Sequence, residues 1–256
     1  MKKHTVFLLL FLILSGCSST YETKEESMIS STKNQSKTTQ TNIPNVQQET
    51  DKNKNKMKDK VLLDVPLIKQ NPELKYGCEI TSVTMLLQYA GVNVNKMQLY
   101  KEVEKDTDKI KKAANGDILN WGDPNEGFVG DMTGRSSGYA VFDKPIVDLV
   151  EKYLPNRSVN LTGYSFQETL QQVNDGKPVV VWTTGDYLQP NRWEEWEHNN
   201  KTIKTPLDLH AVVLVGYDDK NVYVNDPLSG KKQHQVSKNT FIKSWQALKK
   251  RSVSYN

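Results

Sequence analysis

The hydrophobic and polar positions divide the chain of 256 residues into three parts. Residues 6–14 form a continuous apolar run after Lys2 and Lys3, which is too short to cross a bilayer as a helix but fits the core of a signal peptide. Residues 18–60 hold 22 Ser, Thr, Asn and Gln side chains among 43 positions. Such a segment cannot bury enough apolar surface to fold, so we expect the folded domain over residues 61–256.

Within that domain, apolar side chains recur at helical spacing in some segments and form short runs in others. The helical spacing predicts helices over 78–90, 96–105, 143–154, 165–176 and 237–249. The runs predict strands over 61–68, 178–183, 209–217 and 221–225. Ser165 with Glu168, and Asn95 with Gln98, have the spacing of capping boxes at two of the helix starts. Helices dominate the first half and strands the second, which predicts an α+β fold rather than an alternating βαβ fold.

The apolar run ends in Leu14-Ser15-Gly16-Cys17, which resembles a bacterial lipobox. The resemblance implies that residues 1–16 are removed as a signal peptide and that lipid is attached to Cys17. Two or three acyl chains would hold the protein durably on the membrane, facing outside the cytoplasm. The alternative is an ordinary secretory signal with an incidental cysteine.

Residues 17–60 are then expected to be the lipid anchor followed by a disordered tether. As a flexible coil, the tether would span on the order of 35–40 Å between its ends. Residues 52–60 include five Lys. They either touch anionic lipid or a cell-wall polymer, or they form a solvated spacer.

Charge and cysteine content exclude several classes of function. The formal charge of +4 arises in residues 1–60, since residues 61–256 hold 24 basic and 24 acidic side chains. A domain without net charge offers no large basic face, so we expect no nucleic-acid partner. Two cysteines exclude a disulfide framework and a cysteine-ligated iron–sulfur cluster. The glycine-rich residues 113–141 lack the spacing of a phosphate loop and are expected to line a cleft. No His, Asp or Glu group has metal-ligand spacing, so we expect neither a cofactor nor a metal.

The candidate chemistry begins at Cys78, the one thiol left if Cys17 is lipidated. A free thiol outside the cytoplasm is exposed to oxidants, so its presence needs a reason. It is either buried as a small apolar residue or functional. Gly77 precedes it and would leave room for a substrate, while a helix follows it. A thiol at a helix N-terminus is favoured as the thiolate, which is the reactive nucleophile.

A cysteine nucleophile needs a base, and the chain has four histidines. His4 lies in the signal peptide, His198 in a polar segment that predicts a solvated loop, and His234 on an expected edge strand. His210 interrupts the run 209–215, which is apolar on both faces. A polar ring there must be either satisfied in the core or used, and we favour His210 as the base.

A third group should orient the imidazole. Asp226 follows the next strand, although Asn225-Asp226-Pro227 is also ordinary turn sequence. A tight hairpin would pair Asp226 near Val213, about 10 Å along the strand from His210. A bulge, a strand twist or a wider turn must close that gap, so Asn225 and acids elsewhere remain alternatives.

These residues and their surroundings resemble a known family. The sequences Val65-Pro66-Leu67-Ile68-Lys69-Gln70, Gly77-Cys78-Glu79-Ile80-Thr81-Ser82, Trp121-Gly122-Asp123-Pro124 with Gly127-Phe128-Val129-Gly130, His210-Ala211-Val212-Val213-Leu214-Val215-Gly216-Tyr217-Asp218, and Tyr223-Val224-Asn225-Asp226-Pro227 carry the resemblance. They are similar to stand-alone bacterial relatives of the bacteriocin-processing, double-glycine cysteine peptidases, family thirty-nine of the cysteine peptidases. The resemblance covers nearly all of residues 61–248. No membrane domain or ATPase accompanies it here, so double-glycine specificity is not carried over.

The resemblance implies a papain-like fold, in which an N-terminal nucleophile helix packs on an antiparallel half-barrel sheet. It implies peptide-bond cleavage through a thioester, with Cys78 as nucleophile, His210 as base and Asp226 holding one tautomer. The backbone N–H of Cys78 and the side chain of Gln70 would bind the oxyanion, although a glutamine in a surface loop is the alternative for Gln70.

Three functions are therefore compared. The favoured one is a membrane-anchored cysteine peptidase, a monomer acting on peptide or protein substrates. The second is a cell-wall peptide amidase or acyl transferase that uses the same three residues. The third is a catalytically silent peptide-binding module, which the complete set of Cys78, His210 and Asp226 argues against.

Overall fold

The structure, a computed structural model, describes residues 56–256. The expected signal peptide over 1–16 and residues 17–55 of the expected anchor and tether lie outside the described residues. Contacts with the domain begin a few residues before the expected boundary at Val61. The backbone N–H of Lys58 donates to Oδ1 of Asn174 at 3.0 Å, and Met57 packs against buried apolar residues. Among the described helices, none combines the length and apolar character that a membrane span requires.

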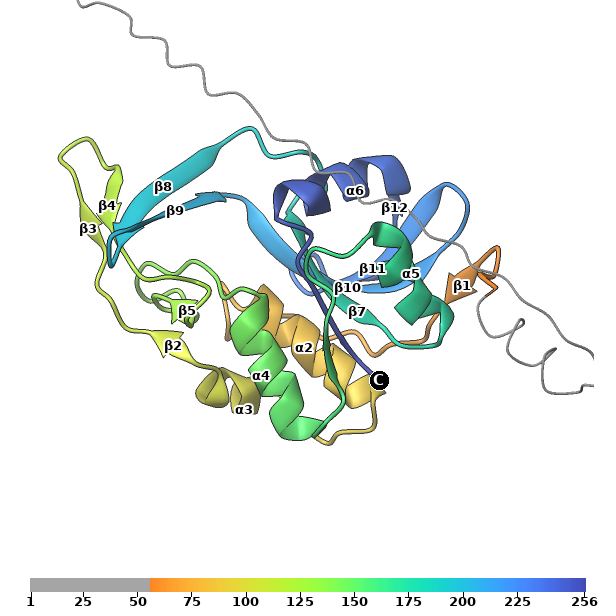
Figure 1. The fold of residues 1–256 in the computed structure, drawn as a ribbon. Helices are drawn as coiled ribbons and strands as arrows, with labels where there is room; N and C mark the ends of the chain where they lie inside the picture. The colour runs from red at the N-terminus through yellow and green to blue at the C-terminus, as the bar shows by residue number, and fades with distance from the viewer. Residues whose placement is uncertain (1–55) are drawn as a thin grey trace, which may run out of the picture. The chain divides into compact units, whose positions relative to one another are not determined.

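A seven-stranded antiparallel sheet forms the centre of the domain (Figure 1). Six strands follow the spatial order β12-β11-β10-β7-β13-β6, and β1 pairs with β10. The bounds are β1 Val61–Leu62, β6 Ser158–Asn160, β7 Val179–Thr184, β10 Leu209–Tyr217, β11 Asn221–Asp226, β12 Lys231–Ser237 and β13 Ser252–Tyr255. The longest strand, β10, lies between β11 and β7.

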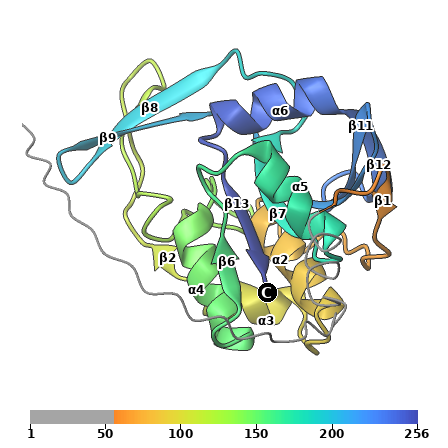
Figure 2. The ribbon, with the colours of Figure 1, turned by 45° about the vertical axis from the view of Figure 1, so that its right-hand side comes forward.

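Helices cover both faces of this sheet (Figures 1 and 2). Helices α2 (Cys78–Tyr89) and α4 (Asp143–Tyr153) pack on one face, and α5 (Phe166–Asn174) and α6 (Lys238–Ala247) on the other. Alternate strand residues point to the two sides: the first core holds Val180, Trp182 and Ala211, and the second holds Val179, Val181, Val212 and Leu214. Burial on both sides explains why these strands are continuous apolar runs instead of alternating patterns.

A second sheet forms a separate layer with its own small apolar core. Its strands, in the order β3-β4-β8-β9, are β3 Lys111–Lys112, β4 Ile118–Asn120, β8 Trp193–His198 and β9 Lys201–Pro206. Trp196 packs there with Trp121 and Val129. The expected solvated loop around His198 is therefore wrong. Asn199 and Asn200 have φ of 47° and 61°, the left-handed pair of a two-residue hairpin turn.

The remaining elements connect these layers. They are α3 Lys96–Glu102, β2 Lys105–Asp106 and β5 Phe128–Val129. The last two pair in parallel. Part of the glycine-rich segment 113–141 is thereby ordered by short strands.

Most of the predicted elements are present with small shifts in their ends. The strand expected over 209–217 is β10 with the same bounds, and the five predicted helices end one to three residues early. The capping box of Ser165 and Glu168 is confirmed. The strand expected over 61–68 is wrong, because only Val61–Leu62 pairs with the sheet. Further along this segment, the Val65 carbonyl accepts a hydrogen bond from the side chain of Asn225 and not from the backbone of a neighbouring strand.

Candidate active site

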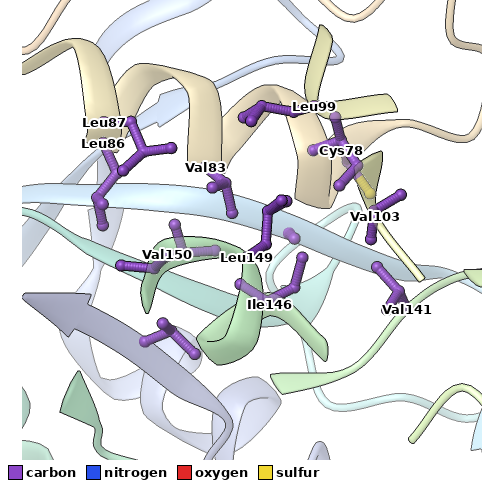
Figure 3. Close-up of a cluster of buried hydrophobic side chains, with 14 of the residues drawn as sticks. Cys78, Val83, Leu86, Leu87, Leu99, Val103, Val141, Ile146, Leu149 and Val150 are labelled. Atoms are coloured by element: carbon purple, nitrogen blue, oxygen red, sulfur yellow. The ribbon is translucent and has the colours of Figure 1, made fainter. Parts of the chain in front are cut away.

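Cys78 is the first residue of α2, the helix that the sequence predicts to carry the nucleophile. It lies at one end of the core between α2 and α4, near Val103 and Val141 (Figure 3). Only 7% of the residue is exposed. Gly77 caps the helix without a side-chain hydrogen bond, so the first backbone N–H groups of α2 have no intrahelical partner.

The start of α2 meets the free edge of β10. Strand β11 ends at Asp226, and the last β10–β11 pair is Val213 with Asn225, so Ala211 has no partner on that side. Helix α2 supplies one: the Ala211 carbonyl accepts a hydrogen bond from Ser82 Oγ at 3.2 Å. Because His210 directly precedes Ala211, this hydrogen bond places the start of α2 next to the backbone of the candidate base.

A bulge in the β10–β11 ladder brings His210 and Asp226 together. Tyr217 pairs with Val222 and Gly216 with Tyr223, but beyond Val215 the register moves by one residue, so that Leu214 pairs with Val224. When this new register is continued past the pair of Val213 and Asn225, Asp226 lies opposite Val212 and not opposite Val213. One residue of slip moves side chains to the other face of a strand, and this slip puts Asp226 on the face that His210 shares with Val212. His210 Nε2 lies 2.8 Å from Asp226 Oδ1.

The carboxylate of Asp226 is surrounded by donors. Its Oδ1 also accepts the N–H groups of Leu228 and Ser229, at 2.8 and 3.2 Å, and its Oδ2 accepts the hydroxyls of Ser229 and Tyr187, at 2.6 and 3.1 Å. Burial by itself would raise the pKa of this carboxyl, but the hydrogen bond and charge of His210, with the Ser229 and Leu228 donors, hold the pKa well below its usual value. Asp226 is therefore an ionised, fixed acceptor, and the other ring nitrogen of His210, Nδ1, is left for proton transfer.

Asn225, the alternative to Asp226, is used elsewhere. It points to the opposite side of β11, is fully buried, and donates from Nδ2 to the Val65 carbonyl at 2.9 Å. Its Oδ1 accepts the backbone N–H of Gln233 at 2.8 Å. The structure brings Asp226, and not Asn225, to the imidazole.

Gln70 is 2% exposed, so it is not the surface-loop side chain considered as the alternative. Its backbone N–H donates to the Pro227 carbonyl at 2.9 Å, which ties its loop to the turn after Asp226. The side-chain Nε2 donates to the Lys75 carbonyl at 2.8 Å, and an amide nitrogen has a second hydrogen to donate. Among the described residues, Gln70 Oε1 is buried without a partner.

The thiol itself differs from the expected thiolate. Cys78 Sγ donates to Oε2 of Glu79 at 3.3 Å. Burial first, and the Glu79 carboxylate second, raise the pKa of Cys78 well above its usual value, against the lowering effect of the Ala211 N–H. In this geometry burial and the neighbouring Glu79 raise the pKa of Cys78 by more than the helix N-terminus lowers it. Glu79 was not singled out from the sequence, because an acid in the first turn of a helix is ordinary.

Comparisons with known proteins show the family of the chain. The Peptidase_C39 like family model matches residues 62–253. The chain belongs to this family. The C39-like chain is 37% identical over 193 residues to the uncharacterized protein YvpB of Bacillus subtilis (strain 168), covering 75% of this chain and 74% of that protein. A crystal structure from Bacillus anthracis, described as a C39-like peptidase, has a TM-score of 0.72 and 40% identity over 78% of this chain and 98% of that one. The predicted α+β, papain-like fold is thus confirmed.

The glycine before the candidate nucleophile of this C39-like protein makes room for its own chain. A Cβ at Gly77 would lie 2.5 Å from Leu74 Cβ, and Leu74 is fully buried. The space expected at Gly77 for a substrate is therefore filled by Leu74.

Gly77→Ala should consequently lower the free energy of unfolding by about 1–3 kcal/mol, as overpacking does. Gly185→Ala is a matched control, because a Cβ there has its nearest neighbour at 4.0 Å. Chemical denaturation of both variants measures the difference. Equal stability of the two would show that Leu74 does not require the glycine.

A second polar cluster joins strand β8 to β2 and to the loop before β5 of the C39-like domain. His198 is 3% exposed, its Nδ1 lies 3.0 Å from the Trp121 carbonyl, and its Nε2 lies 3.4 Å from Glu126 and 3.8 Å from Asp106. Burial alone would lower the pKa of His198, but the Trp121 hydrogen bond and the charges of Asp106 and Glu126 raise it above its usual value.

The three side chains of this cluster each offer a ligand atom within 4.8 Å of the others, which corrects the expectation that no such group exists. Sequence spacing missed it because Asp106, Glu126 and His198 come from three distant segments. The same geometry suits an imidazolium held by two carboxylates, and we assign it no catalytic step.

Proposed function

We propose that the protein is a cysteine peptidase that hydrolyses peptide bonds through a thioester. The observation that carries the proposal is the 2.8 Å contact between His210 Nε2 and Asp226 Oδ1. The hydrogen bond from Ser82 of α2 to the carbonyl of Ala211, the residue after His210, links this pair to the helix that begins at Cys78. Asp226 accepts a hydrogen bond from Nε2 of His210. The other ring nitrogen, Nδ1, is therefore available to take the proton from Cys78. Membership of the C39-like family supports the same chemistry.

The reaction follows from these roles. Cys78 gives its proton to His210 and the resulting thiolate attacks the substrate carbonyl, while Asp226 holds the ring in one tautomer and stabilises its positive charge. His210 then protonates the leaving amine, and the acyl group remains on the sulfur as a thioester. Water, deprotonated by His210, releases the acid and restores the thiol.

The tetrahedral intermediate needs donors aimed at its oxyanion. The backbone N–H of Cys78, free of intrahelical partners at the start of α2, is the first. The second hydrogen on Gln70 Nε2 is our candidate for the other, supported by the burial of this side chain and by its backbone link to Pro227.

We further propose that lipid on Cys17 anchors the enzyme on the outer face of a membrane. The support is the lipobox-like sequence at residues 14–17 behind an apolar run. The substrate would then be an extracytoplasmic peptide or protein.

Peptide libraries and purified cell-wall peptides, incubated separately with the full chain, test the proposed chemistry. We expect new free carboxyl termini in the peptide library, formed at least ~10³-fold more slowly by Cys78→Ala. This variant removes one sulfur atom, so an unchanged melting temperature separates lost chemistry from lost fold. Cleavage that persists in Cys78→Ala, products joined to an amine, or cleavage confined to cell-wall peptides would each contradict the peptidase proposal.

A further inference from the structure

Glu79 is a fully buried carboxyl group directly beside the candidate nucleophile. It occupies the second position of α2 and is 0% exposed. Glutamate is almost never fully buried unless it has a charged partner, and burying a lone carboxylate is costly. The proposed reaction does not use this residue, so its burial calls for a separate explanation.

Both oxygens of Glu79 are held in place. Oε2 accepts from Cys78 Sγ at 3.3 Å, and Oε1 accepts the backbone N–H of Val141 at 3.2 Å. The Val141 carbonyl in turn accepts the indole N–H of Trp182 at 3.0 Å. A rigid connection from the central sheet therefore fixes the carboxyl group against the sulfur.

The titratable groups around Glu79 do not neutralise it. Tyr139, in the segment before α4, is partly buried, and desolvation chiefly, with the Glu79 charge contributing, raises its pKa, so it stays neutral. Asp208, before β10, and Arg251, before β13, also act on Tyr139, and Arg251 Nε lies 3.0 Å from Asp143. Within the described residues, no cation is among the groups that act on Glu79.

Burial raises the pKa of Glu79 to about 7, against the lowering effects of the backbone, Cys78 and Val141 hydrogen bonds. Both protonation states are therefore populated near neutral pH. An anionic Glu79 disfavours a thiolate 3.3 Å away because like charges repel. A neutral Glu79 has an O–H to donate, and a donor at that distance stabilises the thiolate.

We propose that Glu79 is a positioning residue whose proton decides whether Cys78 is a thiolate or a thiol. In the active state Glu79 keeps its proton and donates it in a hydrogen bond to the sulfur, while the Cys78 proton resides on His210. When Glu79 loses its proton to solvent, the proton on His210 returns to the sulfur and the nucleophile is switched off. The inference rests on the proposed Cys78–His210 chemistry and adds a control by pH: the enzyme is active on the acidic side of neutrality.

The rate of iodoacetamide alkylation from pH 5 to 9 tests this, with the full chain and the Cys78 peptide followed by mass spectrometry. A free thiol reacts faster as pH rises. We expect the wild type instead to slow by about tenfold between pH 6 and 8, because a group with a pKa of about 7 falls from about 90% to about 10% protonated over that range. Glu79→Gln keeps an acceptor for Val141 and a donor for the thiolate without a titrating charge. It should lose this decrease and react at least about tenfold faster than wild type at pH 8.

Glu104→Gln is the matched control, because Glu104 is exposed, and its profile should equal that of the wild type. If Glu79 served only to hold Val141, Glu79→Gln would leave the profile unmoved, which would overturn the inference. If Glu79→Gln does not fold, the pH profile of alkylation in the wild type still tests the inference. A wild-type rate that rises continuously with pH, with fast acid labelling that His210→Ala abolishes, would overturn the control by Glu79 while leaving the peptidase proposal intact.

The two proposals fail in different ways. Slow acid labelling that is the same in wild type and His210→Ala would contradict the Cys78–His210 ion pair. The effect of Glu79 on the sulfur would then be measured from the pH at which Cys78 alkylation reaches half of its maximal rate at alkaline pH. A midpoint in Glu79→Gln at least one pH unit below that of the wild type would support the effect of Glu79 on the sulfur, and equal midpoints would overturn it.

Discussion

Asp226→Ala should slow peptide hydrolysis by roughly 10³–10⁴-fold, whereas Asp226→Asn should slow it by only about 10²-fold, the lower end of the range for acid–base catalysis, because the asparagine is held in the orientation that the imidazole needs. The alanine variant removes the acceptor that fixes the His210 tautomer, so both ring nitrogens lose their defined roles. The asparagine variant retains a carbonyl oxygen where Oδ1 now accepts three N–H groups, from His210, Leu228 and Ser229.

The orientation of that asparagine is determined by its neighbours. Three N–H donors on one side repel an amide nitrogen, while the hydroxyls of Tyr187 and Ser229 on the other side can rotate to accept from it. The remaining loss of rate reflects the missing negative charge beside the imidazolium. Values of kcat/KM for both variants on a cleaved peptide measure the two effects.

Acid unfolding provides an independent check on the same residue. The pKa of Asp226 is lowered in the folded protein, so the stability it contributes is present above the unfolded value of ~3.9 and is lost as pH falls below that value. Asp226→Asn should remove this part of the acid sensitivity. Equal losses of activity in the two variants would contradict the argument from the fixed carbonyl.

The sequence was sufficient to predict those parts of the fold whose signals are local. The run 209–215 has apolar residues on both faces, and β10 is covered on both sides, so its bounds followed directly from the pattern. Ser165, the N-cap residue before α5, forms with Glu168 a capping box that can be recognised in the sequence. Strands β8 and β9 were missed because charged residues alternate with Trp196 and Ile203, and the sheet they form lies outside the main core. Asn199-Asn200, a turn pair between alternating residues, was the signal that could have found them.

The candidate site depended on features that spacing cannot show. The sequence selected Cys78, His210 and Asp226 by residue type and order, but a uniform hairpin register would have left His210 and Asp226 on opposite faces. The bulge at Val215 resolves this, and nothing in an apolar run marks where a ladder slips. The burial of Glu79 was hidden for a similar reason. Helix α2 is buried almost all round, through Leu87, whereas its sequence predicted a single apolar face.

Trp182→Ala should have the largest effect on stability, a loss of about 3–5 kcal/mol in the free energy of unfolding. Trp182 is fully buried between the sheet and helices α2 and α4, so the substitution leaves a cavity and deprives the Val141 carbonyl of its donor. For a domain of this size the melting temperature should fall by roughly 6–20 °C. Trp193→Ala, which truncates a side chain in a residue that is 43% exposed, should change the free energy by no more than about 0.5 kcal/mol.

Trp182→Phe separates packing from the hydrogen bond. It retains most of the apolar contact and loses the indole N–H, so the Val141 carbonyl is left unpaired at a cost of about 1–3 kcal/mol. Because Val141 also donates to Glu79, a looser Val141 segment should move the alkylation profile of Cys78 toward that of Glu79→Gln. Calorimetry and the alkylation rates of the same preparation measure both effects. A destabilised Trp182→Phe with an unchanged profile would show that Glu79 keeps its place without support from the sheet.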